Sequence, residues 1–503
     1  MSASKQATEG RDSVSLRPDL GAIAYRSLGD ETLVLDVRRG CVLTLTGASR
    51  LAFDAMLGGA TEHELALRLR RAYAIEAERA VVDTARFVGE LRARGWLEPS
   101  GPSPATDLCG LPKAKPWPRA GLSEPAQWLL DAVYSCSDDR GTRAGAPDAD
   151  AVLRLAAHHR VLPIAVSHLL ARSDTPDVCL AAAHRAGRVE AEQAFRSLTD
   201  LRLIATVLAD IEGGWMLIKG AALERAIRPP KLPRQAGDLD VLVERHAFGD
   251  ALAALEASGA RLVTRNWGLL YRDHRKAVVL QAPAGTLIDL HWSLVPTGAA
   301  AGAVGPEALA PHRRRMIIGG TTVHTLGPLA TAVHTLSHAG GHGGNTLGWM
   351  VDCALALRSV GACWTALAAL AEGWGVSMVT AGMLGRLRRL HPDLVPAIAV
   401  ETVAMRAGWP SALRRAWLAA FVRSDWALID RGRGSVAAVL GLHTHDRGLE
   451  TIRSLASFGG RYARRGGPCR DHVEHYRLDA SDARSDFYDD PSQRAAYVRW
   501  VQE

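Results

Sequence analysis

The sequence predicts an α+β protein in which a small winged-helix-like domain precedes an α/β core that is embedded in largely helical N- and C-terminal extensions. Three features lead to this prediction. Three short apolar runs separated by Gly-Asp and Arg-Gly turns lie near the N-terminus. A strand pattern that carries two aspartates, DLDVLV, lies near the middle of the chain. Apolar residues at helical spacing fill most of the remaining sequence.

The size and composition indicate a globular protein with two or three domains. The chain has 503 residues, of which 48% are hydrophobic and 22% are charged. We find no apolar run of the roughly 18 residues that a membrane span requires, and the polar N-terminus lacks the apolar stretch of a signal peptide. Seven cysteines without a C-x-x-C pair indicate neither a disulfide framework nor a zinc finger. We therefore expect a cytoplasmic protein without a membrane partner.

The charge of the chain narrows the possible partners. The net charge is +7, and arginine supplies almost all of the positive charge. There is no long basic block, and aromatic residues make up only 6% of the chain, so few bases could stack on the protein. We expect no nucleic-acid partner. A nucleotide or an acidic peptide remains possible.

The predicted N-terminal domain covers residues 20–98 and follows a disordered stretch at residues 1–19. Three strands between residues 22 and 47 precede three helices at about 49–59, 61–73 and 79–97. Thr61 and Glu64 have the spacing of a capping box at the start of the second helix.

This domain resembles the PqqD family, whose members recognise the leader peptides of ribosomally synthesised natural products. The resemblance rests on LTLTGASRLAFDAM, GGATEHELALRLRRAY and VVDTARFVGELRARGWL, in the order and spacing of the family. It implies that a precursor peptide binds through its leader, and that other maturation enzymes are possible partners. An extended peptide can add as a further strand to the edge of a small sheet.

The resemblance also implies where the leader docks, which is between the third strand and the third helix. The residues that it indicates are Val42, Leu43, Thr44, Leu45, Arg79 and Arg86. The two arginines would meet acidic leader residues. The alternative is that they only solvate the outer face of the helix.

Two segments without recognisable chemistry separate this domain from the core. Residues 99–120 are rich in proline and predict a linker. Residues 121–212 have helical periodicity, and they include the adjacent His158 and His159, which point to different sides of a helix.

The predicted core covers residues 213–300 and brings three carboxylates together. The segment WMLIKGAALERAI predicts a strand, a Lys-Gly turn and a helix, and DLDVLV and TLIDLHWSLV predict two further strands. Asp238 and Asp240 lie two residues apart, so a strand places them on one face. Two close carboxylates repel each other unless a positive charge lies between them. Together with Asp289 they would bind one or two Mg²⁺ ions, which prefer oxygen ligands.

The core resembles the nucleotidyltransferases of the polymerase-β type and, more narrowly, a group of uncharacterised nucleotidyltransferases, on the segments KGAAL, GDLDVLV and IDLHWSL. The resemblance implies that Asp238 and Asp240 ligate Mg²⁺, while Asp289 completes the site and orients or deprotonates the acceptor. The phosphates of an NTP, expected to be ATP, would contact three further residues, Lys219, Gly220 and Arg234. His291 would bind the acceptor or steady a carboxylate. The broad superfamily has Gly-Gly or Gly-Ser at the turn, and Lys219-Gly220 departs from that pattern.

The predicted C-terminal region at 301–460 is helical, and a polar tail at 461–503 is expected to be loosely ordered. His334, His338 and His342 recur at intervals of four, but the glycines at 340, 341, 343 and 344 are expected to break the helix there. No H-E-x-x-H pattern is present, so these histidines do not indicate a zinc site. Trp349 and Asp352 match a W-x-x-D element of the narrower group and are expected to pack against the core.

The two resemblances together predict a leader-peptide-guided nucleotidyltransferase that transfers a nucleoside monophosphate from an NTP to a ribosomal precursor peptide. Two alternatives remain at the level of the sequence. The nucleotidyltransferase fold could be an inactive scaffold that binds a leader peptide, or the enzyme could modify a small molecule or another protein.

Overall fold

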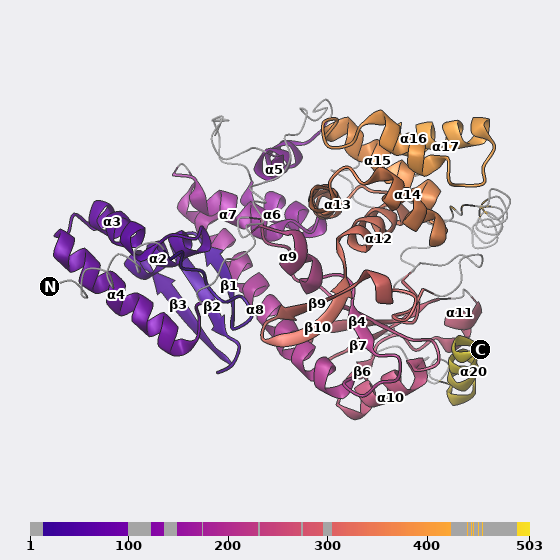
Figure 1. The fold of residues 1–503 in the computed structure, drawn as a ribbon, viewed down its shortest axis with the longest axis horizontal. Coiled ribbons are helices and arrows are strands. Elements are labelled where there is room, and N and C mark those ends of the chain that lie inside the picture. The colour runs from indigo at the N-terminus through magenta and orange to yellow at the C-terminus, as the bar shows by residue number, and fades with distance from the viewer. Residues whose placement is uncertain are drawn as a thin grey trace, which may run out of the picture.

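The computed structural model describes residues 14–98, 122–134, 148–173, 175–229, 232–272, 275–294, 304–423 and 490–503, together with residues 440, 444, 446, 451 and 455. The fold is α+β, as predicted (Figure 1). The predicted proline-rich linker and residues 1–13 lie outside the described ranges. The prediction of disorder is wrong for residues 14–19, where Leu16 is buried and Ser15 and Pro18 form β-bridges with Thr61 and Leu97.

The N-terminal domain has the predicted three strands followed by three helices. The elements are β1 (Ile23–Leu28), β2 (Glu31–Asp36), β3 (Cys41–Thr46), α2 (Gly47–Leu57), α3 (Glu62–Tyr73) and α4 (Ala77–Arg94). The strands form an antiparallel sheet in the order β1-β2-β3, so β3 is an outer strand of this sheet. Phe53 and Val88 are fully buried in the core beneath it. The predicted capping box of Thr61 and Glu64 is confirmed, with both reciprocal hydrogen bonds present.

Four helices follow and connect the N-terminal domain to the rest of the molecule. They are α5 (Glu124–Tyr134), α6 (Ala149–His158), α7 (Leu162–Ala171) and the long α8 (Asp177–Val207). In Figure 1, α8 runs from the N-terminal sheet toward the second sheet. A Cβ on Gly187 of α8 would lie 2.5 Å from the Leu28 side chain, and Arg202 donates to the Val37 carbonyl. The N-terminal domain is therefore held against α8 by direct packing, and its covalent connection to the rest of the chain is not the only link.

The core contains a five-stranded mixed sheet. In chain order its elements are β4 (Trp215–Leu217), α9 (Ala221–Ile227), β5 (Leu239–Val243), α10 (Phe248–Ala257), β6 (Arg261–Leu262), α11 (Trp267–Arg272), β7 (Ala277–Gln281) and β8 (Leu287–His291). The strand order is β4-β5-β8-β7-β6. The central strands β5 and β8 are parallel, and the other neighbouring strands are antiparallel. All five residues of β5 are buried, which explains its apolar sequence.

A β-hairpin follows the core, where the sequence analysis predicted a helical region. After a short 3₁₀ helix (Ala310–His312), β9 (Arg313–Ile318) pairs with β10 (Thr321–Leu326). The turn is Gly319-Gly320, with φ of 50° and 72°, a backbone that favours glycine in a two-residue hairpin turn. Its signal was present in the sequence as a Gly-Gly pair between two short strand-like runs. The prediction of a mostly helical region is therefore wrong at this hairpin.

Helices make up the described part of the chain from 328 to 423. They are α12 (Pro328–Gly341), α13 (Leu347–Val360), α14 (Trp364–Gly373), α15 (Ser377–Leu390), α16 (Ala397–Ala404) and α17 (Ser411–Arg423). The expected break within this glycine run is present: α12 includes Gly340 and Gly341, which are buried, and ends at Gly341, and Gly343 and Gly344 have positive φ. A Cβ on Gly340 would lie 2.7 Å from the Val379 side chain, so a small residue is needed for close helix packing here.

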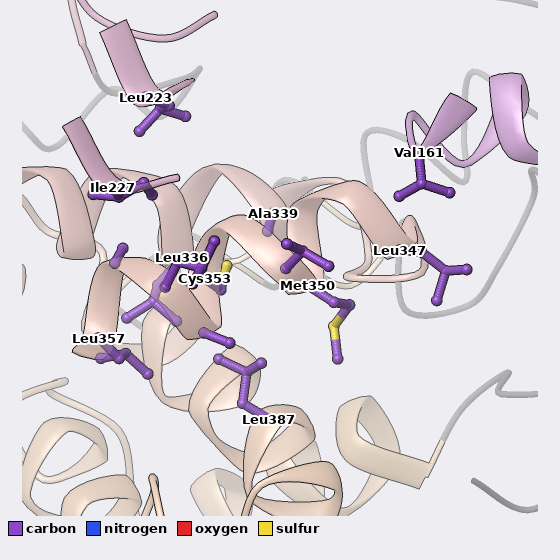
Figure 2. Close-up of a cluster of buried hydrophobic side chains, with 14 of the residues drawn as sticks. Val161, Leu223, Ile227, Leu336, Ala339, Leu347, Met350, Cys353, Leu357 and Leu387 are labelled. Atoms are coloured by element: carbon purple, nitrogen blue, oxygen red, sulfur yellow. The ribbon is translucent and has the colours of Figure 1, made fainter. Parts of the chain in front are cut away.

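A large apolar core joins these helices to α9. Figure 2 shows side chains of α9, α12, α13 and α15 that belong to this cluster, including Leu223, Leu336, Met350 and Leu387. Among the described residues, no single helix is long and apolar enough to cross a membrane. The bent helix pair Leu347–Val360 and Trp364–Gly373 is long and apolar enough together, by length and composition only.

The last described segment is an ordered helix, so the expectation of a loosely ordered polar tail is wrong for this part of 461–503. Helix α20 (Pro491–Gln502) lies beside α10 and α11 (Figure 1). Asp490 caps it by accepting from two backbone N–H groups. Tyr497 and Val501 are fully buried against the core, and the Tyr497 hydroxyl donates to the Arg275 carbonyl at 2.7 Å. Two buried apolar positions one helical turn apart anchor an otherwise polar segment.

Candidate active site

The turn after β4 is shaped by a close backbone contact. Gly220 has φ 57° and ψ −121°, and a Cβ there would lie 3.0 Å from the carbonyl oxygen of Asp238. The backbone N–H of Ile218 donates to the carbonyl of Asp240 at 3.1 Å. Only glycine suits both the positive φ and this approach. The turn thereby places Lys219 against the strand that carries Asp240.

Two of the three predicted carboxylates meet at the centre of the sheet. Asp240 of β5 and Asp289 of β8 are paired residues on adjacent parallel strands. His291, two residues further along β8, lies on the same face. Ligand atoms of Asp240, Asp289 and His291 all lie within 4.8 Å of one another. His291 Nε2 lies 3.1 Å from Asp240 Oδ1, so a ring N–H can donate to this carboxylate.

Asp238 occupies a different position from the one expected. It precedes the first residue of β5 and is not a member of the group formed by Asp240, Asp289 and His291. Its side chain is 29% exposed, and its Oδ1 lies 3.9 Å from Nη1 of Arg160. The i, i+2 rule places side chains on one face only within the strand, and here the strand begins between the two aspartates.

Lys219 supplies a positive charge next to Asp240. Its Nζ lies 2.5 Å from Asp240 Oδ1, and both side chains are largely buried, with 12% and 2% exposed. Burial alone would raise the pKa of Asp240, but the Lys219 ammonium and the hydrogen bond from His291 outweigh it and hold the pKa well below its usual range. Asp240 is therefore ionised at neutral pH.

The donor set fits a divalent cation. Carboxylate oxygens are the ligands that Mg²⁺ prefers, and an imidazole nitrogen suits several other divalent metals. Asp240 and Asp289 could hold such an ion by their oxygens, with His291 either as a further ligand or as the group that orients Asp240. Burial lowers the pKa of His291, which keeps its ring neutral and available for either role.

A second group of polar side chains surrounds a small cavity on the other side of Lys219. The cavity is lined by Lys219, Leu223, Arg234, His334, Thr335, His338, Trp349 and Asp352. His334 is 4% exposed, and its Nε2 has no hydrogen-bond partner among the described residues. The ring of Trp349 packs against His338 and His342, with ring centroids 5.4 Å and 4.9 Å away. Lys219 therefore lies between the carboxylates and a wall of aromatic rings.

Arg234 belongs to a buried ion-pair network. Its Nε donates to Asp352 Oδ2 at 3.1 Å, and Arg228 Nε donates to Asp352 Oδ1 at 2.8 Å. The backbone N–H of Arg234 donates to Glu224. Arg234 also lines the cavity, so it is close enough to Lys219 to act on the same ligand. Asp352 thus has the packing role expected of it, because it joins α13 to the loop before β5.

Acid should destabilise the protein through His334. Burial and the nearby Lys219 lower the pKa of His334 to about 3, whereas an unfolded histidine titrates near 6.5. Between about pH 6.5 and pH 3 the unfolded chain binds more protons at this residue than the folded protein does. The free energy of unfolding therefore falls as the pH falls from about 6.5 toward 3. At pH 5 the loss from this residue is about 2 kcal/mol. Chemical denaturation at pH 7.5 and 5.0 measures it.

The variant His334→Leu provides the comparison. It should lose about 2 kcal/mol less than the wild type between these pH values. At pH 7.5 it should be about as stable as the wild type, because it replaces a buried nitrogen that lacks a partner. Equal pH dependence of the two proteins would show that His334 is protonated or exposed in the folded state.

Four of the residues predicted to bind a peptide lie on β3, the outer strand of the N-terminal sheet. Val42 and Thr44 of β3 are exposed and Leu43 is half-buried, but Leu45 is only 8% exposed. The side chain of Leu45 is part of the domain core, because alternate residues of a strand face opposite sides. Only the backbone of Leu45 remains available to a peptide.

The two arginines of α4 are exposed and share an acidic neighbour. Arg86 Nη2 lies 3.1 Å from Asp83, and Arg79 Nε lies 3.6 Å from the same carboxylate. Both side chains are more than two-thirds exposed, at 75% and 72%. The local pairing favours the alternative that they solvate the helix, although exposed ion pairs are weak enough to exchange for a ligand.

Sequence reasoning missed one residue that lies at this site. Arg160, in the turn between α6 and α7, approaches Asp238 and covers the ring of Trp349, with 5.8 Å between the guanidinium carbon and the ring centroid. The sequence around it has no motif that points to the core. Gly348 packs closely against the backbone of this turn, but a single glycine in the sequence does not show which segment it contacts.

Comparisons with known families match the two parts of the chain separately. Residues 31–97 match the family described as coenzyme PQQ synthesis protein D (PqqD). Residues 145–391 match the family described as uncharacterised nucleotidyltransferase, which includes the sheet, α12, α13 and the α6–α7 turn. No curated protein and no solved structure matches the chain.

Proposed function

This chain joins a PqqD domain to a domain of an uncharacterised nucleotidyltransferase family, and on that premise we propose that it is a leader-peptide-guided nucleotidyltransferase. Its substrate would be a ribosomally synthesised precursor peptide. It would transfer a nucleoside monophosphate from an NTP, with ATP the first candidate, in a reaction that depends on Mg²⁺. The observation that carries the proposal is the in-register pairing of Asp240 with Asp289, next to Lys219.

The proposed reaction replaces one phosphorus–oxygen bond with another. The acceptor oxygen bonds to the α-phosphorus, and the bond from that phosphorus to the bridging oxygen of pyrophosphate breaks. A bound Mg²⁺ would neutralise phosphate charge and hold the triphosphate in line with the acceptor. Asp289 takes the proton of the acceptor hydroxyl through a carboxylate oxygen. Pyrophosphate leaves with the charge of the broken bond.

The residues of this chain divide the remaining tasks between them. Lys219 donates to phosphate oxygens from its position between Asp240 and the cavity. His291 holds the carboxylate of Asp240 in one orientation through its Nε2. Arg234 adds positive charge at the cavity wall. The close approach at Gly220 keeps the turn tight enough for Lys219 to reach these groups.

The N-terminal domain would bind the leader as an additional strand on β3. The sheet ends at β3, and Val42 is 52% exposed on it. The opposite strand, β1, packs against α7 and α8. A peptide is therefore best accommodated at the β3 edge, with which no further strand pairs among the described residues.

One observation favours a second candidate function, that of a scaffold without catalytic activity. The ion pair between Lys219 and Asp240 compensates the buried carboxylate without any metal. In a scaffold this pair would be permanent, and the N-terminal domain would only present a peptide to another enzyme. Binding of Mg²⁺ and NTP by the purified protein separates the two functions.

Intact mass spectrometry of a precursor peptide encoded near this gene tests the proposal directly. The peptide is incubated with the full-length protein, Mg²⁺ and each NTP in turn. A mass gain equal to a nucleoside monophosphate supports the proposal, and a phosphate-sized gain would indicate a different reaction at the same site. A peptide that binds but stays unmodified under all four conditions would favour the scaffold.

A substitution on β3 tests the leader-binding role. Deleting the whole N-terminal domain would expose the face of α8 that it covers, so a point change is preferable. Val42→Asp places a charge on the exposed edge and should weaken leader binding at least ~10-fold, with an unchanged melting temperature. Val178→Asp, at an exposed position of α8, is the matched control. Equal affinities of the two variants, measured by fluorescence anisotropy, would place the leader elsewhere.

A further inference from the structure

The turn between α6 and α7 brings an arginine from the helical segment to the mouth of the site. Arg160 Nη1 lies 3.9 Å from Asp238 Oδ1, and a Cβ on the neighbouring Gly237 would lie 4.0 Å from the same nitrogen. The guanidinium also lies over the ring of Trp349. Arg160 therefore touches both the strand entrance that carries the aspartates and the aromatic wall of the cavity.

The backbone at this position is one that arginine rarely adopts. Arg160 has φ 57°, and among the residues that the structure describes only Ala74 shares a positive φ without being glycine. Both residues follow the end of a helix, where such a conformation is common: Ala74 caps α3, and Arg160 follows His159, the C-cap of α6, with the Val161 N–H donating to the Ala156 carbonyl. Glycine or asparagine would suit the turn at Arg160 better. The turn itself therefore does not require the long charged side chain of Arg160.

The turn is held firmly by the start of α13. A Cβ on Gly348 would lie 2.8 Å from the carbonyl oxygen of Arg160 and 3.0 Å from that of His159. The backbone N–H of Gly348 donates to the His159 carbonyl at 2.9 Å. Two segments that are far apart in the chain are therefore fixed to each other at the residue that carries the guanidinium. The side chain is aimed by this contact rather than left to move with a loop.

The guanidinium still has capacity for a ligand. Its side chain is 43% exposed, and the distance to Asp238 is at the outer limit of an ion pair. A guanidinium offers five N–H donors in a planar fork that matches phosphate oxygens. Lys219, which lines the cavity, lies next to Asp240, and Arg160 lies next to Asp238. A cationic side chain therefore lies beside each of the two aspartates at the start of β5.

From this arrangement we propose that Arg160 is a substrate-binding residue for the terminal phosphates of the nucleotide. The inference rests on the proposed function, because it assigns a contact within the same site. The guanidinium then exchanges the Asp238 carboxylate, which is 29% exposed to solvent, for phosphate oxygens. Trp349 keeps the fork oriented by its ring face. The α6–α7 turn thereby contributes to a site that otherwise consists of the core and the helices after it.

The experiment compares the affinities of full-length variants for a triphosphate and a monophosphate. Calorimetric titration of the wild type with Mg²⁺ and ATP, GTP, CTP or UTP first identifies the nucleotide that binds most tightly, and the corresponding monophosphate is the reference. Arg160→Gly and Arg160→Asn both suit the left-handed backbone, so the melting temperature should stay equal or rise. Arg154→Gln, at an exposed position of α6, is the control, because it also removes one positive charge.

We expect Arg160→Gly and Arg160→Asn to raise the Kd of the triphosphate at least ~10-fold and to leave the Kd of the monophosphate within about 2-fold. Arg160→Lys should give an intermediate loss, because it keeps the charge without the fork. Unchanged triphosphate affinity, or an equal loss for both nucleotides, would overturn the assignment. If the wild type binds no nucleotide, the proposed function itself fails. If the wild type binds a nucleotide and the Arg160 variants bind it equally well, only the assignment of Arg160 fails.

Discussion

Replacing Asp240 by asparagine should slow nucleotide transfer by at least about 10³-fold. Asn keeps the shape of the side chain but removes the negative charge that a cation needs, in a position where only 2% of the side chain is exposed. Release of pyrophosphate in the presence of Mg²⁺, NTP and peptide measures the rate. Asp250→Asn, at an exposed position of α10, makes the same change away from the site and should leave the rate intact. An Asp240→Asn variant with the wild-type rate would remove this carboxylate from the chemistry.

The same substitution should lower stability for a separate reason. Without the carboxylate, the buried ammonium of Lys219 loses its partner, and breaking a buried ion pair costs about 3–5 kcal/mol. A double variant, Lys219→Met with Asp240→Asn, removes both charges and should recover most of that loss. It should remain inactive. Stability and activity would then separate, which identifies the loss of rate as a loss of chemistry rather than of folded protein.

Replacing Arg26 by methionine should lower the free energy of unfolding by about 3–5 kcal/mol. Arg26 lies on β1 and is 12% exposed, and its guanidinium bonds Glu190 of α8 at 3.2 Å and Glu224 of α9 at 3.1 Å. Although burial alone would lower it, the two carboxylates raise the pKa of Arg26 above its usual value. Methionine would leave Glu190, 4% exposed, without this compensation. Denaturant unfolding at neutral pH measures the change.

A surface arginine of the same interface is the control for Arg26. Arg188 pairs with Glu31 across the two domains at 2.7 Å, but its side chain is 55% exposed. Arg188→Met should cost less than about 1 kcal/mol, because water already screens this pair. Similar losses for the two variants would mean that the buried network adds nothing beyond an ordinary surface ion pair.

The Arg26 substitution should also lower activity, through the loop before β5. Glu190 accepts the backbone N–H of Ala236 at 3.0 Å, and Glu224 accepts that of Arg234 at 3.3 Å. The two glutamates therefore hold both the N-terminal domain and the segment that leads to Asp238 and Asp240. We expect the maximal rate to fall more than the affinity for NTP, because the carboxylates lose their exact placement rather than their charge.

The sequence was most informative where one short motif determines a local geometry. Paired aspartates on apolar strands predicted that carboxylates meet on neighbouring strands, and Asp240 and Asp289 do lie in register. It was less informative where strand boundaries matter, since β5 begins after Asp238 and leaves that side chain outside the cluster. Contacts between distant segments, such as Arg160 with Asp238, depend on tertiary packing that local periodicity does not encode.

Another difference has a physical cause of the same kind. The Gly319-Gly320 hairpin had a local signal that the helical periodicity around it concealed. The glycine run did predict the end of α12 at Gly341, but the close packing of Gly340 against Val379 needed the structure. Ion-pair networks such as that of Arg228, Arg234 and Asp352 become visible only when three segments are assembled.

The close contact of Leu28 with Gly187 has a consequence for how a substrate would be selected. A recognition domain on a free tether samples many distances, so any acceptor within reach competes with the others. Here β1 is pressed onto a long helix, and β3 therefore lies at a set distance from Asp240. A leader bound at β3 would therefore hold the residues that follow it in the precursor peptide at fixed distances from Asp240. Under the proposed function, the residue to be modified would be selected by the number of residues between it and the leader, and the sequence around it would be free to vary.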